Sequence, residues 1–129
     1  PILKVRFQQV LDVDISFKNM TPLVNTQLLR AYSDLSPVVR NLVVMVKLWA
    51  KASGVSGAAT GNLSTYSLTL MALYLLQVDT STNMPTLDVS LFKGDGPVPK
   101  QAKQKWECSQ MLSHLLFRFF WFYSGKFQW

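Results

Sequence analysis

A short run of strictly alternating residues, 11–17 (LDVDISF), constrains the fold of this chain more than any other feature. Its odd-numbered positions are apolar, and the even-numbered ones carry acids and a hydroxyl, including Asp12 and Asp14. Because successive side chains of a β-strand point to opposite faces, this pattern predicts a strand with an apolar back and a carboxylate-bearing front. Residues 2–7 alternate in the same way, and the short link 8–10 predicts a β-hairpin or two adjacent strands.

The apolar period becomes helical after the second strand. The pattern predicts a short helix that begins at Asn25 and further helices over about 36–53, 64–78 and 106–123. Ser36 and Pro37 combine an N-cap with a proline at the first helical position, and Gly54 suits the position after a helix end. The segment 64–78 is apolar almost all round, which predicts the central helix of the core.

Composition limits the class of protein. The 129 residues have the length of one domain, and the 13 basic and 7 acidic residues give a formal charge of +6. That charge suits a polyanionic partner such as RNA or a nucleotide, although a domain that is basic without such a partner stays equally open. The single cysteine, Cys108, excludes an intrachain disulfide and fits a reducing compartment. Because the chain begins at Pro1 within a strand-like segment, we expect a fragment of a longer protein.

Two groups of side chains are candidates for binding a metal ion or a phosphate. Asp14 on the polar strand face is either a metal ligand or an ordinary exposed carboxylate. Lys47 and Lys51 lie one helical turn apart, so their ammonium groups either flank a phosphate chain or form a solvated helix edge. His114 is expected to be a surface residue.

A third candidate group lies at the start of the helix predicted over 64–78. Ser64 and Thr65 stand where free backbone N–H groups attract anions, but a simple N-cap explains Ser64 equally well. Tyr66 either stacks on a base or belongs to the core.

Four segments occur in an order that resembles one family. They are 13–17 (VDISF), 25–30 (NTQLLR), 40–51 (RNLVVMVKLWAK) and 61–71 (GNLSTYSLTLM), with a weaker match over 106–129. The set resembles the non-canonical RNA terminal nucleotidyltransferases, which are the terminal uridylyltransferases and non-canonical poly(A) polymerases of the DNA polymerase β superfamily. No single segment is decisive, but four in the family's order are a specific signal.

The resemblance implies a role for Asp14 in catalysis. It corresponds to the third catalytic aspartate of the family, which helps to hold catalytic Mg²⁺ (or Mn²⁺) and positions the RNA 3′-hydroxyl. The resemblance places the family's other carboxylates in an Asp-x-Asp pair upstream of this chain. Asp12 and Asp14 have the same spacing, but no glycine precedes them in residues 1–11, and the continuation Ile-Ser-Phe fits the strand of the third aspartate.

The resemblance also implies which residues bind the nucleotide. Lys47 and Lys51 correspond to the lysines that bind the triphosphate, and a hydroxyl of Ser64 or Thr65 would reach a phosphate. The remaining positions are Asn25, which would contact the ribose, its neighbour Thr26, and Tyr66, which would stack on the base. Thr65 replaces the second serine of the family's pair and keeps the hydroxyl.

The fold that the resemblance implies is α+β. Residues 1–20 would form the C-terminal strands of a nucleotidyltransferase palm sheet. Residues 21–129 would form an incomplete, mostly helical nucleotide-binding domain like that of poly(A) polymerase and oligoadenylate synthetase, including part of the PAP-associated region.

The function implied is template-independent addition of UMP or AMP, from UTP or ATP, to an RNA 3′ end by two-metal catalysis. The partners expected are an RNA 3′ end and a nucleoside triphosphate, with no membrane and with protein partners left open. The alternative is a catalytically inactive family member that serves as an RNA-binding or scaffold module. The compartment stays open among the cytoplasm, which we favour, the mitochondrion and the nucleus.

Overall fold

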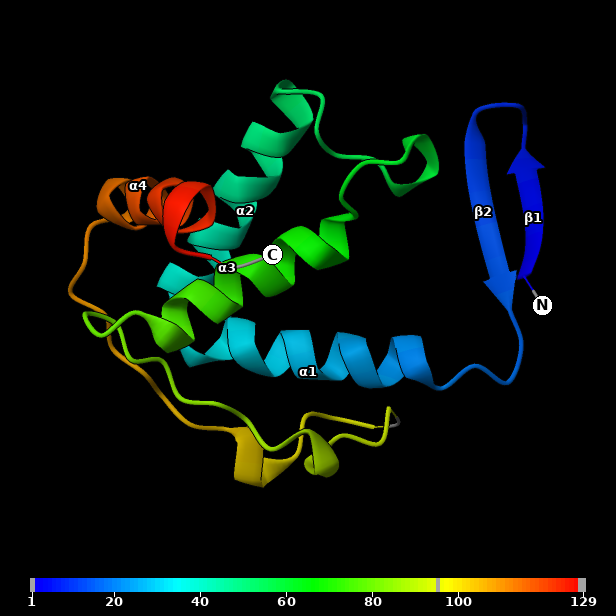
Figure 1. Ribbon diagram of the computed structural model, residues 1–129. Helices are drawn as coiled ribbons and strands as arrows, with labels where there is room; N and C mark the ends of the chain where they lie inside the picture. Colours follow the sequence, from blue (N-terminus) through cyan, green and yellow to red (C-terminus); the bar gives the residue numbers. More distant parts are fainter. Residues whose placement is uncertain (1, 95, 128–129) are drawn as a thin grey trace.

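The computed structural model describes residues 2–94 and 96–127, except for the side chain of Ala59. Two strands and four α-helices of this described part are β1 (Ile2–Phe7), β2 (Leu11–Ser16), α1 (Thr21–Leu35), α2 (Pro37–Ala52), α3 (Thr65–Val78) and α4 (Leu112–Trp121) (Figure 1). A π-helical turn, Phe122–Lys126, follows α4 directly. The predicted α+β content is confirmed.

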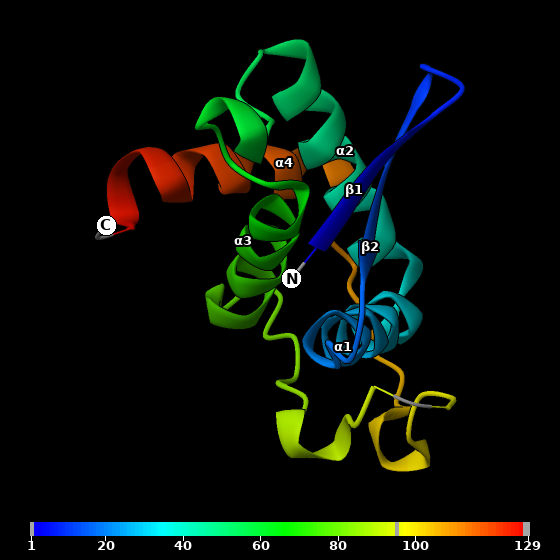
Figure 2. The ribbon, with the colours of Figure 1, turned by 90° about the vertical axis from the view of Figure 1, so that its right-hand side faces the viewer.

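The predicted hairpin is confirmed. β1 and β2 pair antiparallel, with Val5 opposite Val13 on the apolar face and Lys4 opposite Asp14 on the polar face. Both strands are largely exposed, including the apolar side chains Leu3 and Ile15. Figures 1 and 2 show the hairpin beside the helices, at the end of the helical unit where α1 and α3 begin.

Helix α2 holds the other helices together, since α1, α3 and α4 all pack against it. Its ends follow the predicted signals. Ser36 is the N-cap and its hydroxyl accepts a hydrogen bond from the backbone N–H of Val38 at 3.4 Å, while Gly54 after the helix has a φ of +69°. Glycine is favoured there because other residues pay a steric penalty in the left-handed region.

The prediction that the helix over 64–78 lies at the centre of the core is wrong. One side of α3 is buried, including Leu68, Ala72 and Leu76. The opposite side exposes Leu70 and Tyr74, which lie one helical turn apart. Apolar composition all round the helix hides this difference, because only the burial pattern shows which side packs.

Helix α1 begins four residues earlier than predicted. It starts at Thr21, with Pro22 in its first turn, where a missing N–H costs nothing. Asn25 therefore lies inside the helix and not at its start.

The predicted helix over 106–123 begins six residues too early. Residues 103–110 are not helical, and Trp106 instead anchors an extended segment. Its backbone N–H donates to the Leu35 carbonyl at 3.1 Å, and its indole Nε1 donates to the Thr82 carbonyl at 3.1 Å. Cys108 lies in the same extended segment, partly buried, and not in a helix. His114 is exposed on α4, as predicted.

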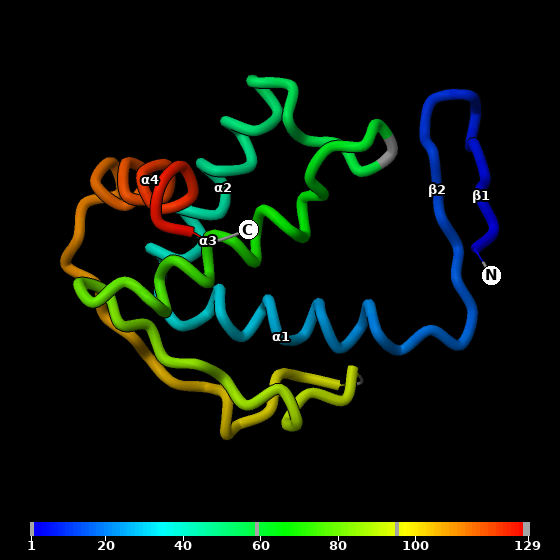
Figure 3. Tube along the Cα trace, viewed as in Figure 1, coloured from blue at the N-terminus to red at the C-terminus, as the bar shows by residue number. Residues whose placement is uncertain are grey.

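The chain between α3 and α4 passes along α1 and then returns (Figure 3). An ion pair closes this excursion, since the Arg118 guanidinium of α4 donates to the carboxylate of Asp79 at the end of α3. The Asp79 side chain is 3% exposed and that of Arg118 is 32% exposed. Burial opposes ionisation of Asp79, but hydrogen bonds from Ser81 and the Arg118 charge outweigh it and lower the pKa of the carboxyl.

We expect Arg118→Met to lower the free energy of unfolding at pH 7 by about 2–4 kcal/mol, because it leaves a buried carboxylate without its cation. Since the folded-state pKa of Asp79 is depressed, the stabilisation is present above its ordinary pKa of 3.8 and is lost as the pH falls further. Urea titrations at pH 7 and pH 3 should therefore show a difference between variant and wild type that shrinks in acid.

The matched control for Arg118 is Arg30, which pairs with Asp34 on the surface at 3.0 Å. Arg30→Met should change the unfolding free energy by less than about 0.5 kcal/mol, since exposed pairs contribute little. Equal losses for the two variants would contradict the assigned importance of the buried pair.

Candidate functional site

The predicted site residues lie on four elements of the described chain. Asp14 lies on β2, Asn25 and Thr26 lie early in α1, and residues 64–66 form the start of α3. The starts of α1 and α3 lie at the end of the helical unit beside which the hairpin stands (Figures 1 and 2). Three of the four segments that the sequence singled out therefore lie on one side of the molecule.

Asp14 is an exposed carboxylate on the polar face of the hairpin. Lys4 occupies the cross-strand position opposite it, and Asp12 on the same face pairs with Arg6 at 3.2 Å. The described residues contain no cluster of three side chains suited to hold a metal ion. Mg²⁺ is usually bound through one or two protein carboxylates together with substrate phosphates. The carboxylate of Asp14 therefore has the right chemistry to be one ligand of such a site.

The early part of α1 offers two polar side chains. Thr26 is exposed, and its hydroxyl donates to the Pro22 carbonyl at 2.7 Å, which leaves the oxygen able to accept from a ligand. Asn25 is half-buried. An amide and a hydroxyl in this position have the donor and acceptor groups that a sugar requires.

The start of α3 combines a cap with exposed groups. The Ser64 hydroxyl accepts from the backbone N–H of Ser67 at 2.9 Å, so the N-cap interpretation of Ser64 is confirmed. Thr65 is exposed, and the backbone N–H groups of Thr65 and Tyr66 precede the first intrahelical bonds. Tyr66 is 38% exposed, which contradicts the interpretation of it as a core residue. The helix start thus presents N–H donors, a hydroxyl and a ring together.

Lys47 and Lys51 lie on the C-terminal half of α2, where Lys47 is half-buried and Lys51 exposed. A cation in the last turn of a helix is favourable because it interacts with the negative end of the helix dipole, so Lys51 also stabilises α2. The loop after α2 folds back so that the Gly57 N–H donates to the Leu63 carbonyl at 3.0 Å. That bond ties the loop to the residue that precedes the Ser64 cap.

Sequence reasoning missed Gln27, the buried neighbour of Thr26. Its amide nitrogen donates to the carbonyls of Gly96 and Pro97 at 3.2 and 3.1 Å, and its amide oxygen accepts from the Gly94 N–H at 3.2 Å. Gln27 therefore fixes a loop from the other half of the chain against α1. No local signal shows this role, because the partners lie about seventy residues away along the chain.

No family model matches the chain. Curated relatives do match it. Terminal uridylyltransferase 7 of Homo sapiens is 40% identical over 96 residues, which cover 74% of this chain and 6% of that protein. Poly(A) RNA polymerase GLD2 of Xenopus tropicalis is 39% identical over 88 residues, 67% of this chain and 17% of the relative. Poly(A) RNA polymerase gld-2 of Caenorhabditis elegans is 38% identical over 93 residues, 70% of this chain and 8% of the relative.

The chain belongs to the non-canonical RNA terminal nucleotidyltransferases. The family expected from the order of the four segments is thereby confirmed, and the names of these relatives denote enzymes. The chain spans less than a fifth of the length of each relative. Among the described helices, none combines the length and the hydropathy needed to cross a membrane.

Two neighbouring hydroxyls at the start of α3 can be separated by experiment. Ser64→Ala should lower the free energy of unfolding by about 1 kcal/mol, because it removes the cap of α3. Thr65→Val keeps the side-chain volume, removes only an exposed hydroxyl, and should leave stability within about 0.5 kcal/mol of wild type. Urea unfolding measures both variants; a larger loss for Thr65→Val than for Ser64→Ala would contradict the cap assignment.

Proposed function

We propose that the protein containing this chain is a template-independent RNA 3′-terminal nucleotidyltransferase that adds UMP or AMP from UTP or ATP. The observation that carries the proposal is its similarity to both a terminal uridylyltransferase and poly(A) RNA polymerases. The geometry supports it, because a strand carboxylate and two helix starts with exposed polar groups lie on one side of the described chain.

The proposed division of the chain follows the same assignment. Residues 1–20 would be the last strands of a nucleotidyltransferase palm, and residues 21–129 would belong to the helical nucleotide-binding domain. The hairpin lies beside the starts of α1 and α3 (Figure 2). This position supports a nucleotide site between the proposed palm strands and the proposed helical domain.

In the proposed reaction the RNA 3′-hydroxyl attacks the α-phosphate of the nucleotide, and pyrophosphate leaves. Bound Mg²⁺ or Mn²⁺ would supply charge neutralisation and orient the reacting oxygens, with Asp14 as one of its ligands. Lys47 and Lys51 would hold the triphosphate, and the start of α3 would bind a phosphate through Thr65 and its backbone N–H groups.

The remaining proposed contacts hold the nucleoside. Asn25 and Thr26 would bind the ribose, and the exposed ring of Tyr66 would stack on the base. Stacking on an aromatic ring contributes about 1–3 kcal/mol per base and tolerates any base, so Tyr66 would not select UTP over ATP.

The alternative is a catalytically inactive family member that binds RNA or serves as a scaffold. An exposed Asp14 opposite Lys4 is compatible with either function, since the lysine offsets the carboxylate when no metal ion is bound. Activity of an Asp14 variant separates the two.

Asp14→Asn should reduce nucleotide addition by the protein that contains this chain at least tenfold, while RNA binding changes little. Loss of a metal ligand removes several kcal/mol of transition-state stabilisation. Extension of a labelled RNA with UTP or ATP measures the effect. Asp12→Asn is the matched control, because Asp12 shares the strand face but pairs with Arg6. A wild-type rate in Asp14→Asn, or an equal loss in Asp12→Asn, would contradict the assignment.

Lys47→Ala and Lys51→Ala should each raise the KM for the nucleoside triphosphate, because each removes a cation from the triphosphate. The increase should be smaller at high salt, where charges are screened. Steady-state kinetics at two salt concentrations measure this, with the exposed Lys126→Ala as the control for loss of one charge. An unchanged nucleotide KM combined with lower stability would favour the interpretation as a solvated helix edge.

A further inference from the structure

Two hollows of about 420 and 450 Å³ lie between α1 and the returning segment (Gly94 and residues 96–105). They adjoin each other, because they share Asp34, Val98 and Lys103 in their walls, and we describe the two together as one groove. One end of the groove lies at Thr26 on α1, and the other lies at Arg40 on the first turns of α2. We call it the basic groove.

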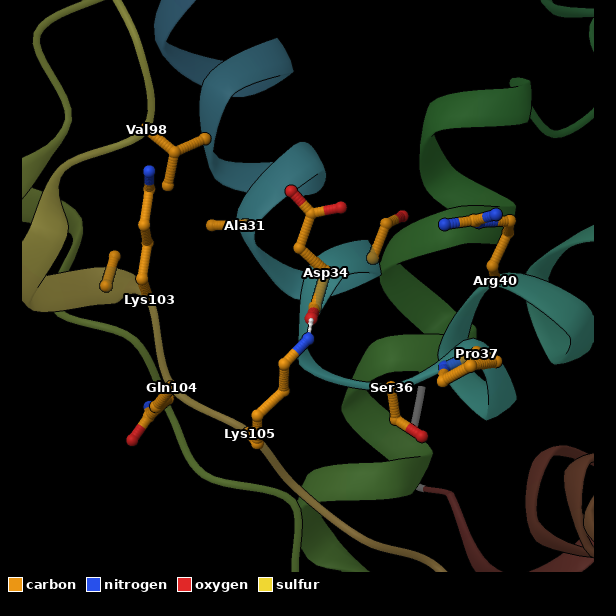
Figure 4. A pocket seen from close by; sticks show the side chains of 11 residues that line it. Ala31, Asp34, Ser36, Pro37, Arg40, Val98, Lys103, Gln104 and Lys105 are labelled. Carbon is orange, nitrogen blue, oxygen red and sulfur yellow. Dashed lines mark hydrogen bonds between the residues drawn. The ribbon is translucent and has the colours of Figure 1, made fainter.

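The charge of the basic groove is strongly positive. Its walls carry four cations and one anion: Arg30, Arg40, Lys103, Lys105 and Asp34. Figure 4 shows Lys103 and Lys105 on one side of Asp34 and Arg40 on the other. The Arg30 Nε donates to both oxygens of the Asp34 carboxylate, at 3.1 and 3.0 Å. This ion pair neutralises the one acid of the groove and does not use the two terminal nitrogens of Arg30.

Hydrogen bonds between α1 and the returning segment hold the walls of the groove in place. Gln27 fixes Gly94, Gly96 and Pro97 against α1, and Trp106 fixes the other end of the returning segment to Leu35. The Lys105 ammonium also donates to the Asp34 carbonyl at 3.4 Å, across the groove. The groove is therefore formed before any ligand arrives, which lowers the cost of binding.

The lining chemistry suits phosphates and sugars more than bases. The described lining residues include no aromatic ring on which a base could stack. They do include hydroxyl and amide groups, on Ser33, Ser36 and Gln104, which hydrogen-bond phosphate oxygens in nucleic-acid complexes. The base of a free nucleotide would find no ring to stack on here. The phosphates and sugars of a nucleic-acid backbone, in contrast, can contact the cations, hydroxyls and amides of the lining.

We propose that the basic groove holds the phosphodiester backbone of the RNA whose 3′ end is extended. The 3′ end lies at Thr26, next to the proposed nucleotide site, and the upstream nucleotides lead toward Arg40. This inference rests on the proposed function. From Thr26 to Asp34, α1 rises about 12 Å, which corresponds to about three to four stacked nucleotides. Contacts of this kind bind RNA without regard to sequence.

The test is equilibrium binding of a 5′-labelled 12-nucleotide RNA to the protein that contains this chain, without nucleotide, from 50 to 300 mM salt. The variants are Arg40→Ala, Lys103→Ala and the double variant. Lys100→Ala is the matched control, because Lys100 lies on the same segment and is exposed but does not line the groove. Lys103→Arg should restore binding. Thermal unfolding verifies that each variant is folded.

Each groove variant should raise the Kd about fivefold at 50 mM salt and reduce the slope of log K against log salt by about 0.7, the value for one single-strand phosphate contact. Lys100→Ala should change the Kd less than twofold. Neutral methylphosphonates at the second to fourth linkages from the 3′ end should weaken wild-type binding and have little further effect on the double variant. The KM for the nucleoside triphosphate should not change.

Three outcomes would overturn the groove assignment: wild-type RNA affinity in the double variant, an equal loss in Lys100→Ala, or equal competition by polyglutamate. Failure of the proposed function looks different. If the groove variants lose RNA affinity but the wild-type protein transfers no nucleotide, the groove proposal stands and the inactive alternative is supported. If the protein transfers nucleotide and the double variant has an unchanged KM for RNA, the proposed function stands and the groove proposal is wrong.

Discussion

The buried face of α2 is the constraint on which the rest of the helical unit depends. Val39, Leu42, Val46 and Ala50 follow one another at helical spacing and expose no surface. α1, α3 and α4 all pack against this helix, so shortening one of its large buried side chains would cost about 2–5 kcal/mol. The same burial fixes the orientation of α2 and, with it, the relative positions of the lysines on its other faces.

Polar side chains from distant parts of the chain attach the long connection to this unit. The Tyr32 hydroxyl accepts from the Gln77 amide at 2.9 Å and from the backbone N–H of Leu87 at 3.0 Å. Together with Gln27 and Trp106, it holds the excursion between α3 and α4 along α1. Since buried polar groups left without partners are costly, these bonds favour one path for a segment whose described residues form no long helix or strand. The basic groove exists because that path lies close to α1.

Local chemistry decided which parts of the fold were predictable. The period-2 strands, the Ser36 and Ser64 caps and Gly54 set element ends through neighbours in the chain, and the structure matches those ends closely. The start of α4 depends on Trp106, whose partners lie far away in sequence, and the apolar pattern around it resembles a helix. The site shows the same division: residue identities came from the family resemblance, whereas the exposure of Tyr66 and the role of Gln27 required the structure.

The two faces of the hairpin have different requirements. Leu3, Phe7 and Ile15 are more than half exposed on the apolar face, and an isolated two-stranded sheet is marginally stable in water. Further structure is therefore expected to cover that face. Because alternation places Asp14 on the opposite face, such cover would fix the hairpin without burying the carboxylate. The alternating pattern thus separates the two requirements: the apolar half can be covered by further structure, while Asp14 on the acidic half stays exposed, as its proposed role as a metal ligand requires.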